Sequence, residues 1–169
     1  LFRDHPLQAD IWTANADGSG ERRVTQAPRG LIDDQPDWSP DGKRVVFQRG
    51  PSVDGPWTLW ITNADGSGTR RLSPARGWCL DESSPAFSPE GRRIAFECHD
   101  HTSKRELFSI VVMNTRGRNR RVAVRGTGAF GVGRPQFSPD GQHLVFERQN
   151  ISAKPKNGHA TFVAAVNGG

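Results

Sequence analysis

The sequence predicts an all-β protein, a β-propeller built from four-stranded antiparallel blades. The main observation is a Ser-Pro-Asp/Glu-Gly turn, followed by an apolar segment ending in Phe, that begins at Ser39, Ser88 and Ser138. A second turn motif and a pair of arginines recur with the same period of about fifty residues. Self-similarity at a fixed period of this length, about 20 to 50 residues, indicates a propeller or a solenoid.

The Ser-Pro-Asp-Gly motif predicts a tight hairpin between the first two strands of each blade, here called A and B. Proline presets the first corner of the turn, Asp bonds its own backbone, and Gly adopts positive φ at little cost. Strand A ends in an aromatic residue, and strand B is a continuous apolar run that ends in Phe. Such runs indicate a strand covered on both faces, as stacked sheets require. The aromatic residues are Trp38, Phe87 and Phe137 for strand A, and Phe47, Phe96 and Phe146 for strand B.

A second hairpin is predicted between strands C and D. Strand C is an apolar run at 11–14, 59–62, 110–113 and 163–166, and each run precedes a turn that begins with Asn. The turn reads Asn-Ala-Asp-Gly-Ser-Gly at Asn15 and Asn63 and is shortened at Asn114 and Asn167. Paired arginines open strand D, where charge at the sheet edge discourages pairing with a foreign strand.

These motifs resemble the TolB-like, WD-type β-propeller repeat family, most closely over residues 34–73. The resemblance covers nearly the whole chain and implies a non-enzymatic scaffold for protein interaction in a periplasmic or extracellular setting. It also implies a ring of six blades, whereas this chain supplies about three and a half to four. The expected division of the single propeller segment 1–169 is a partial blade at 1–25, blades at 35–73 and 84–124, and a partial blade at 135–167.

The predicted blade count describes a partial propeller or half of an assembled one. Terminal repeats need a cover for their apolar faces. A partner chain, further blades, ring closure, or a homo-oligomer that completes the propeller would each provide that cover. The 19 Gly and 12 Pro suit the many turns. No apolar stretch approaches the length of a membrane span, about 20 residues, and no signal peptide is visible.

The basic character of the chain does not by itself predict nucleic-acid binding. The net charge is +5 and the isoelectric point is about 10. Many arginines occupy recurring positions on strands B and D, so the repeat spreads them instead of gathering them into one groove. No nucleic-acid-binding module with interleaved aromatic residues is recognisable. A nucleic-acid partner is therefore not expected.

The two cysteines are expected to lie near each other. Across the Pro89-Glu90-Gly91 turn, Cys98 should face Glu82, which places it within a few residues of Cys79. A disulfide requires Cα atoms within about 7 Å, and it would indicate an oxidising compartment. The alternative is two unrelated thiols, one of them half-buried.

Candidate binding residues come from the long, unequal loops, because function concentrates on variable loops held by a rigid scaffold. Acidic residues and one arginine at the ends of the D-A loops are predicted to form a rim around the axis, and three aromatic residues are predicted to act as exposed anchors. Turn capping by the acids and packing of the aromatics within the loops are the alternatives. The rim residues are Asp33, Asp34, Asp81, Glu82 and Arg134, and the anchors are Trp57, Trp78 and Phe130.

Catalytic and cofactor signals are weak. The Gly-rich segment 126–131 matches a dinucleotide pattern but no helix follows it. His99-Asp100-His101 lacks a third metal ligand, so no cofactor or metal is predicted. The preferred function is a scaffold that binds another protein through its long-loop face. The alternatives are a propeller segment of a serine oligopeptidase-type enzyme and a propeller that binds a carbohydrate or small ligand.

Overall fold

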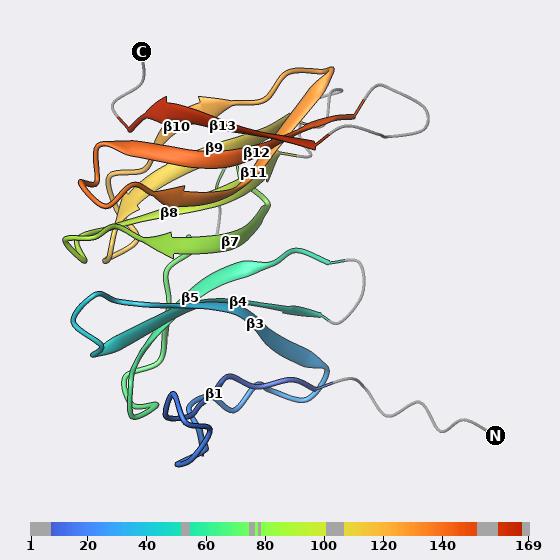
Figure 1. Cartoon of the computed structure of the whole chain (residues 1–169). Helices are drawn as coiled ribbons and strands as arrows, with labels where there is room; N and C mark the ends of the chain where they lie inside the picture. Colours follow the sequence, from blue (N-terminus) through green and yellow to red (C-terminus); the bar gives the residue numbers. More distant parts are fainter. Residues whose placement is uncertain are drawn as a thin grey trace.

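The structure, a computed structural model, describes residues 8–51, 55–74, 77, 79–100, 107–151 and 159–166. Its four antiparallel sheets are stacked in chain order like neighbouring blades (Figure 1), which confirms the predicted all-β propeller fold. The first sheet contains β1 (Trp12–Thr13) and β2 (Arg22–Arg23). The second contains β3 (Leu31–Trp38), β4 (Arg44–Pro51), β5 (Thr58–Asn63) and β6 (Arg70–Arg71). The third contains β7 (Asp81–Phe87), β8 (Arg93–Asp100), β9 (Leu107–Asn114) and β10 (Arg121–Arg125), and the fourth β11 (Phe130–Phe137), β12 (His143–Asn150) and β13 (His159–Ala165).

The inner strands β3, β7 and β11 begin earlier than the motifs predicted. In β3, Leu31 to Asp34 pair with β4 although they were expected to belong to a loop. A β-bulge then places Gln35 and Pro36 opposite the single residue Phe47. Bulges at the corresponding positions of β7 and β11 repeat this arrangement. Proline has no backbone N–H to donate to the strand ladder, and the bulge accommodates it. Because the ladder resumes on the far side of the proline, strand A extends toward the long-loop side.

Three apolar clusters lie between successive sheets and form the core. Alternate residues of one strand face opposite neighbours, as the pleat requires. In β4, Val45 and Phe47 pack against the first sheet, whereas Val46 packs against the third. In β8, Ala95 likewise packs toward the fourth sheet, and Phe96 toward the second. This two-sided burial accounts for the continuous apolar runs of the B strands.

The Ser-Pro-Asp-Gly hairpins have the predicted chemistry. Ser39 Oγ accepts a hydrogen bond from Arg44 N at 2.9 Å and donates one to Asp41 at 2.6 Å. Gly42 N bonds Ser39 O, and Gly42 has a φ of 67°. The Ser39 hydroxyl, together with the Lys43 amide, holds the pKa of Asp41 below its usual value. The turn is therefore stabilised locally.

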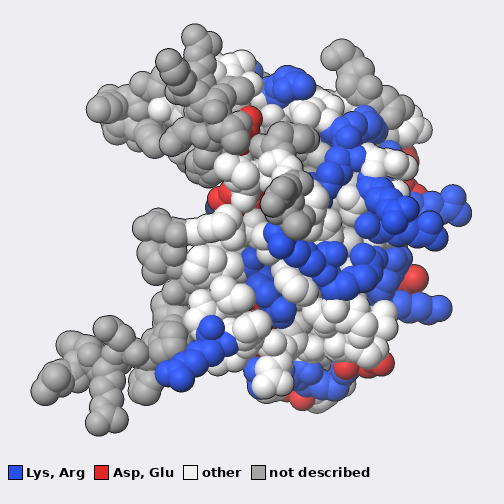
Figure 2. Space-filling model, turned by 180° about the vertical axis from the view of Figure 1, so that it is seen from behind, with Lys and Arg blue, Asp and Glu red and all other residues white. Residues whose placement is uncertain are grey.

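Several arginines join neighbouring blades, where the sequence had predicted a solvated sheet edge. The guanidinium of Arg22 donates to Ala64 O at 2.7 Å, and that of Arg70 donates to Thr115 O at 2.8 Å. Arg93 on a B strand donates in the same way to Gly141 O of the next blade at 2.9 Å. Figure 2 shows Lys and Arg side chains gathered along one side of the molecule. Part of the basic character therefore serves blade packing.

The register of β13 corrects one assignment made from the repeat. His143 pairs with Ala165, as Arg44 pairs with Asn63 and Arg93 with Asn114. Ala165 therefore stands where the motif had been assigned to Asn167, two residues away. Among the residues that the structure describes, no helix is long and apolar enough to cross a membrane.

Candidate binding groove

A groove crosses the inner strands of three successive sheets on the long-loop side. Its volume is about 390 Å³. Each of the three inner strands contributes the residue that precedes the proline of its bulge. These residues, Gln35, Ser84 and Arg134, all have left-handed φ values near +50°. Such a conformation costs a non-glycine residue about 1 to 3 kcal/mol, and strain of this kind concentrates at functional sites.

The same position of three B strands supplies polar side chains to the groove. Gln48, Glu97 and Glu147 each directly follow the Phe of their strand. Gln48 Oε1 accepts a hydrogen bond from Ser84 N of the next sheet at 3.0 Å. The Glu97 carboxylate accepts the corresponding bond from the backbone N–H of Arg134. These bonds link each B strand to the bulge of the following blade.

The surroundings of Glu97 in the groove shift its pKa. Burial raises the pKa of Glu97, and the nearby carboxylates of Asp81 and Glu147 act in the same direction. The Arg134 backbone N–H and guanidinium lower the pKa but do not outweigh burial. The Glu97 carboxylate also lies against Gly133, where an added Cβ would collide with it. Glycine at position 133 thus makes room for the carboxylate.

The structure brings together three of the eight predicted binding residues: Trp57, Asp81 and Arg134 line the groove. Asp81 Oδ1 accepts a hydrogen bond from Trp57 N at 3.0 Å and so attaches the start of strand C to the next blade. Arg134 is paired with Glu147 at 3.3 Å, and its side chain remains 70% exposed. The Arg134 side chain is therefore accessible to a ligand.

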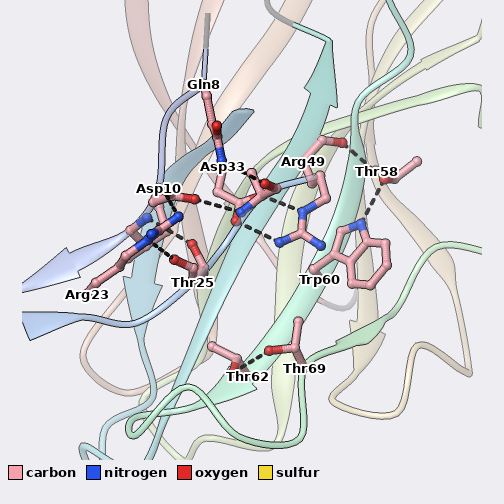
Figure 3. A network of polar contacts seen from close by, with 12 residues as sticks. Gln8, Asp10, Arg23, Thr25, Asp33, Arg49, Thr58, Trp60, Thr62 and Thr69 are labelled. Carbon is pink, nitrogen blue, oxygen red and sulfur yellow. Dashed lines mark hydrogen bonds and ion pairs between the residues drawn. The ribbon is translucent and has the colours of Figure 1, made fainter. Parts of the chain in front are cut away.

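Asp33 belongs to a buried network and not to an exposed rim, which corrects its predicted position. Its carboxylate receives two hydrogen bonds from Arg49, at 2.5 and 2.7 Å. The Arg49 guanidinium lies 4.6 Å from the centre of the Trp60 ring, and Trp60 Nε1 donates to Thr58 Oγ1 (Figure 3). Asp33 is only 3% exposed. This network joins β3, β4 and β5 within one blade.

Glu82 is also buried, which corrects its assignment to the rim. Its carboxylate accepts bonds from Arg120 at 2.5 Å and from Ser73 Oγ at 2.6 Å. Cys98 takes the place that Arg49 has in the preceding blade, and Glu82 is paired instead by Arg120, which directly precedes β10. Buried charges require such partners.

The remaining predicted residues lie outside the groove lining. Asp34 is exposed and its carboxylate accepts a hydrogen bond from Gln35 N at 2.7 Å, a local turn contact. Phe130 is half-buried, and the Arg148 guanidinium lies 4.0 Å from the centre of its ring. The Asp34 contact agrees with the turn-capping alternative, and the Phe130 contact agrees with the packing alternative. Trp78 lies outside the described residues.

Cys79 and Cys98 form a disulfide with a Cα–Cα distance of 5.5 Å. Cys98 is fully buried and pairs with Glu82 in the strand ladder, as the hairpin count predicted. The disulfide attaches the segment before β7 to β8, next to the groove. It is consistent with an oxidising environment.

Sequence reasoning missed Gln35, Gln48, Ser84, Glu97 and Glu147. Two signals could have identified them: residues before a recurring proline, and polar residues directly after the recurring Phe. Both positions vary from repeat to repeat, whereas the proline after the first and the Phe before the second are constant. Within the described ranges, no three His, Cys, Asp or Glu residues are placed to hold a metal ion.

Comparisons with known proteins identify the fold. No protein-family profile and no curated protein matches the chain. The structure of TolB from Acinetobacter baumannii is similar, with a TM-score of 0.68 and 16% identity over 95% of this chain and 36% of that one. A putative TolB from Agrobacterium tumefaciens has a TM-score of 0.60 and 22% identity over 92% and 50% of the two chains. A structure from an analysis of two prolyl endopeptidases has a TM-score of 0.65 and 16% identity over 92% and 24%.

The chain thus spans between about a quarter and a half of the length of these proteins. At such identities the likeness concerns the fold, and one fold serves many functions. The stacked four-stranded sheets, the recurring hairpins and these matches together establish that the chain has the β-propeller fold found in TolB and in other propeller domains.

Proposed function

We propose that this chain is a non-enzymatic propeller module that binds another protein through the groove and the loops around it. The observation that supports this proposal most is the meeting of Gln35, Ser84 and Arg134 beside one groove. The backbone repeats at these three positions while the side chain changes. A recurring strained backbone with varied side chains is what a recognition surface on a repeat scaffold requires.

The groove suits an extended segment of a partner chain. Trp57 and Phe108 provide aromatic surface, and the amide side chains of Gln35 and Gln149 provide donors and acceptors for a peptide backbone. Aromatic anchors surrounded by polar groups are typical of protein interfaces. A volume of about 390 Å³ accommodates a few residues and not a whole domain. The partner would therefore insert a loop or a terminus.

The setting we propose is periplasmic or extracellular. The Cys79–Cys98 disulfide supports this setting because structural disulfides persist in oxidising compartments. The likeness in fold to TolB from Acinetobacter baumannii agrees with the scaffold role.

A second candidate function rests on the likeness to a prolyl endopeptidase structure. In this alternative the propeller would be one part of a serine oligopeptidase-type enzyme. Turnover of a fluorogenic prolyl peptide by the natural full-length protein, lost after treatment with a serine-directed inhibitor, would support the enzyme and count against the scaffold.

The scaffold proposal is tested by filling the groove. Ser84→Arg places a large side chain there, and Arg134 shows that this backbone position accepts arginine. Gln142→Arg is the control, because it adds the same charge to a short hairpin turn where Arg92 is the counterpart in the preceding sheet. We expect Ser84→Arg to reduce partner recovery from extracts of the source organism at least tenfold, and Gln142→Arg to leave it unchanged. Equal recovery by both variants would contradict binding at the groove.

A further inference from the structure

We infer that the groove selects a partner segment that places a lysine or arginine side chain over Glu97, between Asp81 and Glu147. This inference rests on the proposed function and specifies the chemistry of the partner. It concerns an extended peptide segment with a basic side chain, bound in a groove with aromatic walls.

The first argument is the comparison of Gln48 with Glu97. Both side chains perform the same structural task, since each accepts the backbone N–H of the bulge residue in the next sheet. The neutral amide of Gln48 accomplishes this task at 3.0 Å. The negative charge of Glu97 is therefore not needed for the contact between blades. It remains available to a ligand.

The second argument is the charge balance of the groove. Among the residues that the structure describes, the charged ones that line the groove are Asp81, Glu97, Glu147 and Arg134. Arg134 is paired with Glu147 in an exposed contact of 3.3 Å, which solvent screens. An excess of negative charge thus remains in a chain with a net charge of +5. Burial and the other two acids raise the pKa of Glu97, and an incoming cation would offset both effects because opposite charge favours the ionised carboxylate.

The third argument is the shape of the walls. Trp57 and Phe108 both line the groove that contains the acids. The Phe108 ring is held by stacking on His99, with ring centres 4.0 Å apart and an angle of 13° between the planes. Aromatic faces attract ammonium and guanidinium groups through the negative potential of the ring face. The long apolar stems of Lys and Arg also pack well on such rings. Charge and shape therefore favour the same side chains.

The inference is tested with an array of acetylated heptapeptides whose central residue is Lys, Arg, Gln or Glu and whose other positions are randomised. Binding of the best peptides is then measured by fluorescence anisotropy. We expect those centred on Lys or Arg to bind at least tenfold more tightly than the matched Gln peptides. Glu97→Gln should reduce this preference to less than about threefold, because it keeps the hydrogen-bond acceptor and removes the charge.

Two control variants keep the result interpretable. Glu90→Gln makes the same chemical change on a hairpin turn, where Glu90 pairs with Arg93, and should leave the preference intact. Gln48→Glu adds a carboxylate with the geometry that Glu97 already adopts, and should increase the preference. Should Glu97→Gln not fold, the Gln48→Glu result decides.

Each remaining outcome overturns the inference in a distinguishable way. If the Gln peptides bind as tightly as the Lys peptides and Ser84→Arg abolishes both, the groove binds peptides but does not select a cation. A preference for Glu peptides would assign recognition to Arg134. If Ser84→Arg changes the binding of no peptide, both the cation and the groove are excluded as determinants of binding.

Discussion

The two ends of each blade differ in how much their residues vary from repeat to repeat. At the short-turn end, serine and aspartate make the same contact in the second and fourth sheets, at Ser39 with Asp41 and at Ser138 with Asp140. At the groove end, corresponding positions hold different residues: Gln48 becomes Glu97, and Asp33 becomes Glu82 and then Val132. At both ends the backbone nevertheless repeats from blade to blade, including the bulges.

The pKa values of acids at the two ends are also shifted in opposite directions. Hydroxyl and backbone donors lower the pKa values of the turn acids, whereas burial raises that of Glu97. Local hydrogen bonds stabilise the turn acids in their ionised form, while Glu97 is charged at a cost to the folded state. The ionised turn acids thus stabilise the folded state, whereas the ionised Glu97 carboxylate destabilises it.

The largest effect is expected from the buried ion pair of the groove end. Glu82→Ala should lower the free energy of unfolding by about 3 to 5 kcal/mol, since Arg120 and Ser73 lose a buried partner. Urea denaturation followed by fluorescence measures the change. Glu90→Ala removes an exposed pair and should cost less than about 1 kcal/mol. Equal losses for the two variants would contradict the burial argument.

The next effect concerns the disulfide beside the groove. Reduction should lower the free energy of unfolding by about 2 to 4 kcal/mol, because the bond constrains a segment of 19 residues in the unfolded chain. The measurement compares urea midpoints with and without a reductant. A variant with both Cys79→Ala and Cys98→Ala should show no response to the reductant. An unchanged midpoint for the native chain would count against a stabilising disulfide.

A smaller and uniform effect is expected at the short-turn end. Ser39→Ala and Ser88→Ala should each cost about 1 kcal/mol, the usual value of a hydrogen bond to a buried hydroxyl. Both serines are buried, and both accept a backbone N–H at 2.9 Å. Thermal or urea unfolding should give losses that agree within a few tenths of a kcal/mol. A clear inequality would show that this end is not equivalent from blade to blade.

The smallest effect is a difference in pH dependence. The raised pKa of Glu97 means that the folded state binds a proton more tightly than the unfolded state, so acidification from above this pKa toward 4.5 increases stability. The lowered pKa of Asp41 has the opposite sign: its stabilisation is present above about 3.8 and is lost as the pH falls through the lower folded value. Urea midpoints across pH 3 to 8 measure both.

Two neutral variants separate these contributions. Glu97→Gln should remove the gain on mild acidification, and Asp41→Asn should remove part of the loss at lower pH. The same pH profile for Glu97→Gln and the native chain would refute the assignment of the gain to this carboxylate.

Local chemistry made the hairpins and the spacing predictable. A Ser-Pro-Asp-Gly turn is encoded in four neighbouring residues, and counting from it correctly placed Cys98 opposite Glu82. Beside the turn Phe87 pairs with Ile94, and the bulge further along β7 shifts the register by one residue, so that Glu82 faces Cys98. The assignment of the second turn failed where its motif had decayed, as at Ala165.

The candidate site was predicted only in part for a related reason. A shift of one position along the strand decides whether an acid of the predicted rim is exposed or buried, because neighbouring residues of a strand face opposite sides. Asp81 thus reaches the groove, whereas Glu82 points into the core. The alternation of exposed and buried residues was predictable. Which residues of this segment are the buried ones was not, because the start of the strand had been predicted to be a loop.

The sequence by itself determined the propeller repeat, its turns and its two-sided apolar strands, because each depends on residues close together in the chain. Only the tertiary structure decided which polar residues became structural and which remained open to a partner. Arg70 reaches a carbonyl 45 residues away, and Gln48 reaches an amide 36 residues away. Such contacts form only when blades stack, so their partners depend on the fold and not on local sequence.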